Sequence, residues 1–261
     1  MLITRLVTAA IALPMFIGGL LWLPNPYWTG ILLFLLLIGA WEWTKLCGYS
    51  RTGSGLFLTA VLISAAAVFL LSHDVWVYGA SVAFWMLLAP AWLKFRWRAT
   101  HSLLLGLTGW IVLVPTWLAL TRLQIQPLQL LSFLAIVWIA DSAAYFSGKR
   151  FGRRKLAPDI SPGKTWEGAI GAAVAVAVYY IVLHFALEPA VAWPGALTGV
   201  ILFAMITVMS IEGDLFESWI KRQAGVKDSG TLLPGHGGVL DRIDGLTSTM
   251  PLAALAVLYA A

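Results

Sequence analysis

Residues 200–222, VILFAMITVMSIEGDLFESWIKR, join an apolar run to a charged segment without a turn signal between them. The run up to Ile211 carries no charged side chain, and five charged side chains follow within the next eleven residues. If the helix continues beyond the apolar run, residues three and four apart share one face. That face then carries Asp214, Glu217, Ser218 and Lys221. The pattern predicts a membrane helix that ends in a polar, functional turn.

The composition of the whole chain agrees with a membrane protein. Of the 261 residues, 60% are hydrophobic and 11% are charged, and 14 are tryptophan. A water-soluble globular domain carries about 25% charged residues. We therefore expect an all-α, polytopic integral membrane protein.

Runs of about 20 apolar residues, the length that spans a bilayer, occur about nine times. We expect five of these helices in an N-terminal scaffold, residues 1–125, and four in a catalytic region, residues 126–261. The catalytic region also contains two charge-rich loops, residues 148–167 and 214–245. The predicted spans are Ile3–Leu23, Tyr27–Leu46, Gly55–Ser72, Val75–Leu93, Leu103–Leu123, Leu128–Ser147, Gly168–Leu187, Trp193–Leu215 and Leu246–Ala261.

Basic residues are distributed unequally between the two sides of this arrangement. With the N-terminus in the cytoplasm, 16 of the 17 Lys and Arg residues lie on the cytoplasmic side, and only Arg122 lies on the other. Lys and Arg are enriched in cytoplasmic loops of membrane proteins. We expect a cytoplasmic N-terminus and two cytoplasmic charge-rich loops.

Polar chemistry is concentrated in the C-terminal half. Of the 29 charged residues, 20 lie between Asp141 and Asp244. The single cysteine, Cys47, excludes a cysteine-built zinc site, and the four histidines lack metal-binding spacing. Any metal is expected to be a hard cation bound by oxygen.

The segment 213–245 combines carboxylates, basic residues and glycines. Glycines around His236 disfavour a helix and could present backbone N–H groups to phosphate. Asp241 and Asp244, three residues apart, project one way on a helical turn. With Asp214 they would repel one another unless a cation such as Mg²⁺ neutralised them. Basic side chains that suit an anionic ligand are Lys221, Arg222, Lys227 and Arg242.

A second polar segment runs from Trp138 to Gly168. Asp141 lies within an apolar helix, where an unpaired carboxylate is costly, so a functional role is expected. Gly163-Lys164-Thr165 resembles the end of a P-loop, but Pro158 stands where the first glycine is required. Lys164 and the hydroxyls of Ser161 and Thr165 still suit contact with phosphate ahead of the following helix.

These motifs resemble one known family. The run from Ser218 to Arg222, then Lys227-Asp228, then His236 to Asp244, is similar to the signature of the phosphatidate cytidylyltransferase (CDP-diacylglycerol synthase) family. SPGKTWEG, residues 161–168, resembles that family's upstream motif, in which the position of Gly163 is commonly Lys. The resemblance is tight in the two polar segments and extends to the other helices only in hydropathy.

The resemblance implies an Mg²⁺-dependent reaction of CTP with phosphatidic acid that gives CDP-diacylglycerol and pyrophosphate. We assign metal binding to Asp214, Asp241 and Asp244, and catalytic roles to Lys221, Arg222, Asp241, His236 and Asp228. Supporting roles go to Asp141, Glu167, Glu217 and Ser218. Phosphate or nucleotide contacts are expected from Ser161, Lys164, Thr165, Lys221, Arg222, Lys227, Gly237, Gly238 and Arg242.

Two other functions compete with this prediction. A CTP-dependent lipid kinase would use the γ-phosphate instead of the α-phosphate. A transporter would place ionisable groups near mid-bilayer, often in repeated halves, and no such repeat is apparent. With the resemblance we expect the bilayer, CTP and phosphatidic acid as partners, no nucleic acid, and insertion in a bacterial inner membrane with the site facing the cytoplasm. A second cation and a homodimer are compatible with the sequence.

Overall fold

The computed structural model describes residues 2–187, 196–232, 235 and 237–260. These residues are almost entirely helical, and each predicted span overlaps a helix, so the helical fold class is confirmed. The helices are α1 (Leu2–Trp22), α2 (Asn25–Leu46), α3 (Arg51–Leu71), α4 (Asp74–Ala83), the π-helix η1 (Phe84–Leu88), α5 (Ala89–Phe95), α6 (Ser102–Leu123), α7 (Pro127–Phe151), α8 (Trp166–Leu187), α9 (Ala196–Gln223) and α10 (Leu240–Ala260).

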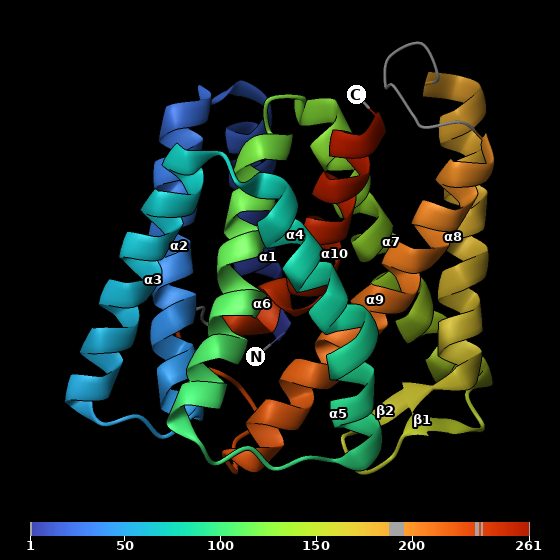
Figure 1. Ribbon diagram of the computed structural model, residues 1–261. Coiled ribbons are helices and arrows are strands. Elements are labelled where there is room, and N and C mark those ends of the chain that lie inside the picture. The colour runs from blue at the N-terminus through green and yellow to red at the C-terminus, as the bar shows by residue number, and fades with distance from the viewer. Residues whose placement is uncertain (1, 188–195, 233–234, 236, 261) are drawn as a thin grey trace.

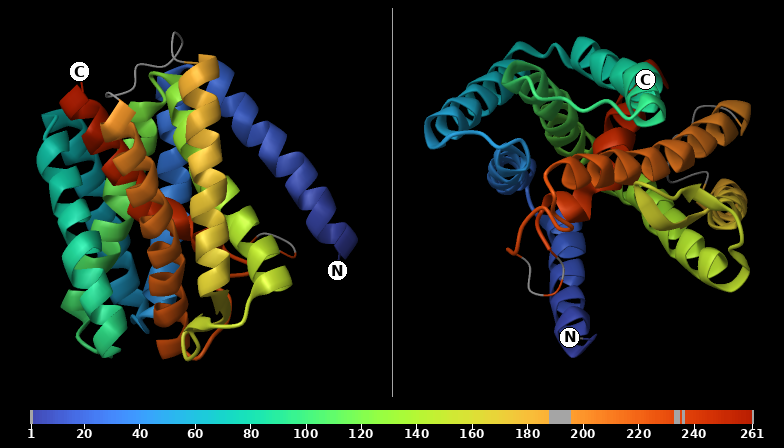
Figure 2. Two further views of the ribbon diagram at one scale, coloured as in Figure 1. Left: turned by 90° about the vertical axis from the view of Figure 1, so that its right-hand side faces the viewer. Right: turned by 90° about the horizontal axis from the view of Figure 1, so that it is seen from below.

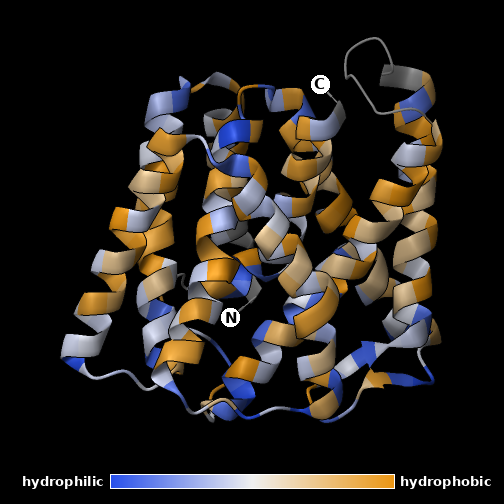
Figure 3. Ribbon diagram, viewed as in Figure 1, coloured by the Kyte–Doolittle hydropathy of each residue, from blue (hydrophilic) through white to orange (hydrophobic). Residues whose placement is uncertain are grey.

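Seven helical segments in the described part of the chain are long and apolar enough to cross a membrane. The continuous helix formed by α4, η1 and α5 counts as one of them. α1 contributes a shorter apolar stretch, Ala10–Trp22, and α10 is not among the seven. Hydrophobic residues cover the helices, while hydrophilic residues gather at the lower edge of the molecule (Figure 3). The polytopic prediction therefore holds, and the count of nine spans stays a prediction.

α10 occupies the centre of the bundle, between α6 and α9 (Figure 1). Small side chains permit this packing: Leu240, at the start of α10, lies against Gly39 of α2. Gly39 is seven residues before the end of α2, so α10 begins inside the bundle and not at its edge. By contrast, α1 leans away from the other helices (Figure 2), although Leu20 near its end is buried.

The ends of α2, α5, α7 and α9 lie together at one end of the molecule, at the bottom in Figure 1. The basic connections that follow these helices are therefore on the same side, as the charge distribution predicts. Whether that side is the cytoplasm stays a prediction.

The all-α prediction misses one small sheet. Strands β1 (Lys155–Ala157) and β2 (Ser161–Thr165) form an antiparallel hairpin after α7. α7 extends to Phe151, so the connection is shorter than the predicted loop 148–167. The Gly163-Lys164-Thr165 stretch is part of a strand, which agrees with its rejection as a P-loop.

The second predicted loop, 214–245, is also shorter. α9 continues to Gln223 and α10 starts at Leu240, so the connection comprises residues 224–239. The expected helical face of α9 is therefore confirmed. Contacts of α10 with α2, α4 and α6 also join the predicted scaffold to the predicted catalytic region.

Candidate functional site

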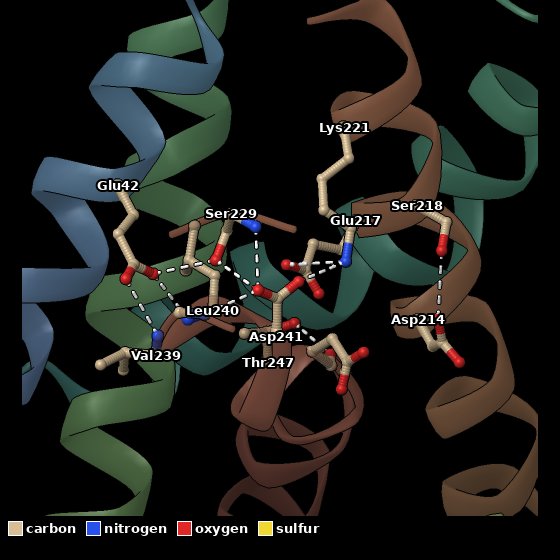
Figure 4. A network of polar contacts seen from close by, with 12 residues as sticks. Glu42, Asp214, Glu217, Ser218, Lys221, Ser229, Val239, Leu240, Asp241 and Thr247 are labelled. Carbon is tan, nitrogen blue, oxygen red and sulfur yellow. Dashed lines mark hydrogen bonds and ion pairs between the residues drawn. The ribbon is translucent and has the colours of Figure 1, made fainter. Parts of the chain in front are cut away.

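The polar end of α9 faces the first turn of α10. Lys221 of α9 is buried, and its Nζ lies 2.6 Å from Oδ1 of Asp241 and 3.4 Å from Oε1 of Glu217. Glu217 and Lys221 meet because they are one helical turn apart on α9. Lys221 and Asp241, both predicted site residues, therefore lie together (Figure 4), while their predicted roles stay predictions.

Asp241 is enclosed by hydrogen-bond donors. Its Oδ2 accepts bonds from the backbone N–H of Ser229 at 2.8 Å, the Ser229 hydroxyl at 3.0 Å and the N–H of Gly238 at 2.8 Å. Burial alone would raise the pKa of the Asp241 carboxyl, but Lys221 and the two N–H groups outweigh burial and hold the pKa below its usual value. Both oxygens are occupied, so these contacts do not support the predicted role of Asp241 as a metal ligand.

Glu42 of α2 completes this arrangement from the other half of the chain. The Glu42 carboxylate is 1% exposed and accepts the N–H groups of Val239 and Leu240, each at 3.0 Å. The Ser229 hydroxyl oxygen also lies 3.0 Å from Oε2 of Glu42, so its single proton is shared between the Glu42 and Asp241 carboxylates and joins them (Figure 4). Glu42 thus caps the start of α10, where backbone N–H groups lack helical partners. We call Glu42, Ser229, Asp241 and Lys221 the closed network.

Sequence reasoning missed Glu42, although a signal was present. A carboxylate between Trp41 and Trp43 of an apolar helix is as unusual as Asp141, which was singled out for that reason. Only the fold shows its partners, because Glu42 and Leu240 are 198 positions apart.

The glycine loop serves this network. A Cβ on Gly238 would lie 2.2 Å from the Ser229 hydroxyl and 2.4 Å from Glu42 Oε1, and one on Gly237, at φ +81°, would lie 2.5 Å from Asp241. The glycines therefore let two carboxylates approach the backbone. The N–H groups of residues 238–240 bind these carboxylates, so the predicted use of Gly238 as a free phosphate-binding donor is not supported.

A second carboxylate group lies beside the closed network. Asp214 of α9 pairs with Lys164 of β2 at 2.7 Å, and it accepts the Ser218 hydroxyl at 3.2 Å. Lys164 also donates to the carbonyl of Ile211, at 3.1 Å, which docks the hairpin on α9. The negative charges of Asp214 and Asp141 repel one another, and, besides burial, each charge also raises the pKa of Asp244. We call Asp141, Asp214 and Asp244 the open carboxylate group.

The close approach of α9 and α10 creates this group. A Cβ on Gly213 would lie 2.5 Å from the Asp244 carbonyl and 2.6 Å from the Ser248 hydroxyl, so only glycine permits the crossing. Asp244 lies just before the predicted last span. Its pKa is raised to about 7, first by burial and then by the charge of the Asp214 carboxylate. Lys164 partly offsets this charge. The Gly245 N–H, 2.8 Å from Oδ1 of Asp244, also lowers the pKa, but these contacts do not return it to its usual value, so this group of carboxylates suits a cation.

No three acidic, histidine or cysteine side chains converge closely enough to hold a metal ion in the described residues. Mg²⁺ usually takes one or two protein carboxylates and completes its shell with water and substrate phosphate. The oxygen donors of the open carboxylate group fit that mode of binding, whereas a preformed cage would not be expected.

Several predicted contact residues stabilise the fold locally. Thr165 is buried, and its hydroxyl accepts the N–H of Gly168 at 3.1 Å, capping α8. This bond explains the Thr165 position without a phosphate. Glu167 accepts the N–H groups of Arg153 and Arg154 and fixes the chain between α7 and β1. Ser161 is half-buried in β2.

The remaining predicted residues lie at the surface or outside the described residues. Arg222, Lys227, Asp228 and Arg242 are exposed. Arg242 is near enough to Asp141 to stabilise its charge, whereas Arg222 points away from Lys221 into another hollow. His236 lies outside the described residues, so its predicted role is untested.

Comparisons with known proteins point to one family. Residues 3–260 match the sequence model of the cytidylyltransferase family. A phosphatidate cytidylyltransferase of Pseudomonas aeruginosa is 38% identical, covering 100% of this chain and 98% of its own length. Relatives of the same name from Haemophilus influenzae and Brucella suis are 36% and 38% identical, covering 88% and 98% of this chain and 90% and 91% of their own lengths.

Proposed function

The chain belongs to the cytidylyltransferase family, and on that premise we propose that it transfers CMP from CTP to phosphatidic acid in phospholipid biosynthesis. The products are CDP-diacylglycerol and pyrophosphate. The nearly full-length similarity to relatives named phosphatidate cytidylyltransferase carries this proposal. As a family member, the chain is an enzyme of the nucleotidyltransferase class.

The position of the polar groups supports a reaction between a lipid and a soluble nucleotide. Lys164, Asp214 and Asp244 lie where the hairpin meets α9 and α10, near the charged end of an otherwise apolar bundle. Phosphatidic acid presents its phosphate at a membrane surface, and CTP arrives from water. We propose that this end faces the cytoplasm at the inner membrane.

In the proposed reaction a phosphatidate oxygen attacks the α-phosphorus of CTP, and the bond from that phosphorus to the bridging oxygen of pyrophosphate breaks. A phosphate monoester is already nucleophilic near neutral pH, so the residues act mainly by positioning and charge neutralisation. Lys164 and Arg242, the cations beside the open carboxylate group, are the candidates for contact with phosphate oxygens. The closed network holds the loop and α10 in place around them.

We assign Mg²⁺ to the open carboxylate group, with Asp214 and Asp244 as its protein ligands. When bound, Mg²⁺ would neutralise phosphate charge and help the pyrophosphate leave. Burial and the neighbouring Asp214 carboxylate, which raise the pKa of Asp244, support this assignment, because a divalent cation would stabilise both carboxylates in their charged form.

The test uses purified protein in phosphatidylcholine nanodiscs that contain phosphatidic acid. CTP labelled at the α-phosphorus should place its label in lipid and release one pyrophosphate per lipid formed. EDTA should stop the reaction, and excess Mg²⁺ should restore it. Absence of labelled lipid from folded protein would refute the proposed function.

The same assay distinguishes the two competing functions. A lipid kinase would transfer label from γ-labelled CTP and leave the α-label in solution. A transporter would incorporate neither label. The family match favours transfer of the α-phosphoryl group with its nucleoside.

A further inference from the structure

A hollow of about 460 Å³ lies at the charged end of the molecule, apart from the two carboxylate clusters. Its lining residues come from the end of α5 and the segment after it, from the hairpin and from the end of α9, elements that lie at the bottom of Figure 1. We call it the arginine hollow, and its lining residues are Arg96, Arg98, Asp159, Trp219, Arg222 and Gln223.

The arginine hollow and the candidate active site use different faces of α9. Trp219, Arg222 and Gln223 line the hollow. Lys221 points instead toward Asp241. Adjacent residues of a helix project about 100° apart, so Lys221 and Arg222 reach different places. Lys221 and Arg222, both predicted to contact phosphate or nucleotide, therefore lie in different surroundings.

The hollow carries an excess of positive charge. Arg96 forms an ion pair with Asp159, in which both side chains remain more than half exposed. Within the described residues neither Arg98 nor Arg222 lies within ion-pair distance of a carboxylate. Three guanidinium groups thus face one carboxylate. Guanidinium groups bind phosphate oxygens through paired, charge-assisted hydrogen bonds.

The walls of the hollow are held in place. The indole N–H groups of Trp92 and Trp219 both donate to the carbonyl of Trp97, at 2.8 and 2.9 Å. The N–H of Ala99 donates to the side-chain oxygen of Gln223, at 3.1 Å. These bonds fix the segment that carries Arg98 against the segment that carries Arg222. Pre-organised groups lose less conformational freedom when a ligand binds.

The backbone of Arg96 adopts an uncommon conformation. Arg96 ends α5 at φ +52°, in the left-handed region that residues other than glycine seldom adopt. Its ion pair with Asp159 draws the connection between β1 and β2 toward α5. Two segments far apart in sequence therefore converge on the same hollow.

We propose that the arginine hollow is a binding site for a phosphate group, separate from the site of nucleotidyl transfer. The ligand chemistry is a phosphate oxyanion, carried either by a phospholipid headgroup at the membrane surface or by a soluble phosphate. The proposal stands on the charge and construction of the hollow and does not require the proposed reaction.

The first arm of the test measures a soluble ligand. Purified protein in phosphatidylcholine nanodiscs is titrated with inorganic pyrophosphate by calorimetry, with EDTA present so that metal-dependent binding at the open carboxylate group is silent. The variants are Arg98→Gln and Arg222→Gln. The matched control is Arg51→Gln, which removes an exposed arginine at the same end of the molecule. We expect each hollow variant to bind at least about fivefold more weakly, as loss of one charge-assisted contact implies.

The second arm measures a lipid ligand. Nanodiscs contain phosphatidylcholine with one fifth phosphatidylglycerol, and native mass spectrometry counts the phosphatidylglycerol retained by the released protein. A lipid site predicts that Arg98→Gln and Arg222→Gln each retain about one anionic lipid fewer than Arg51→Gln. Thermal unfolding checks that all three variants are folded.

The two arms together distinguish a phosphate site in the hollow from its absence. Weakened binding in either arm, confined to the two hollow variants, supports the site and identifies the source of its phosphate. Binding that matches the wild type in both arms, or an equal loss in Arg51→Gln, overturns the proposal. Because neither arm measures CDP-diacylglycerol, the result is independent of the proposed function.

Discussion

The closed network and the open carboxylate group lie side by side but differ in how their charges are satisfied. Asp241 is bound by a lysine, a hydroxyl and two backbone N–H groups. Asp244, three residues later, is raised in pKa by burial and by Asp214. The two aspartates of one motif are therefore suited to different tasks. Asp241, with hydrogen bonds to both oxygens, stabilises the fold, whereas Asp244, which accepts one backbone N–H and lies beside a second carboxylate, is suited to bind a cation.

Asp244→Asn should show the largest effect, because it removes charge where a cation and phosphate would meet. We expect at least about a 100-fold loss in the rate of CDP-diacylglycerol formation, the scale seen when one electrostatic contact to a transition state is removed. Thermal stability should change little, or rise, since burial and Asp214 disfavour the charged form of the wild-type carboxyl. Rates from α-labelled CTP and thermal unfolding test this. Retention of most activity would show that Asp244 is not a ligand of the catalytic cation.

Asp241→Asn should act mainly on stability. It leaves Lys221 buried beside Glu217 without its nearest partner, and breaking such a pair costs roughly 3–5 kcal/mol. The melting temperature should fall clearly, and activity should fall with it as the loop and α10 loosen. Lys221→Met, which removes the other charge, should also destabilise. An unchanged melting temperature for Asp241→Asn would contradict the structural role of the closed network.

Glu42→Gln should have a smaller effect of the same kind. Glutamine keeps one acceptor oxygen, so one of the N–H groups of Val239 and Leu240 loses its partner, at a cost of about 1–3 kcal/mol. We expect a lower melting temperature and a reduced turnover number, with the KM for CTP nearly unchanged. A variant with wild-type stability and turnover would show that the cap on α10 is dispensable.

Asp74→Asn provides the smallest expected effect on activity. Asp74 pairs with Arg122 at 2.9 Å, at the end of the molecule opposite the hairpin. Removing this partly buried pair should lower stability, but below the melting temperature the transfer rate should stay within about twofold, because distant sites without shared partners act independently. A large selective loss of activity would extend the functional region across the bundle.

The sequence predicts the parts of this structure that depend on local pattern. Apolar runs locate the helices, and the spacing of Asp214, Glu217 and Lys221 correctly predicts a shared helical face. The sequence also places Lys221 and Asp241 in one candidate site, but it assigns them to phosphate and to metal, and their direct ion pair was not predicted.

The features that the sequence does not predict depend on long-range contacts. Glu42 meets Leu240 only because α2 and α10 pack together. The glycine loop was expected to offer free N–H groups, and periodicity cannot show that two carboxylates occupy them. The role of Thr165 was not predicted either, because a hydroxyl before a helix can cap the helix as well as bind a phosphate.

Binding of Mn²⁺, a paramagnetic substitute for Mg²⁺, tests most directly whether Asp244 binds a cation while Asp241 stabilises the fold. Electron paramagnetic resonance of folded, purified protein below its melting temperature gives the affinity of each variant without reference to turnover. We predict that Asp244→Asn weakens Mn²⁺ binding at least about tenfold, consistent with loss of a carboxylate ligand to a divalent cation, and that Asp241→Asn leaves the affinity within about threefold of the wild type. A loss at Asp241→Asn as large as that at Asp244→Asn would contradict the account.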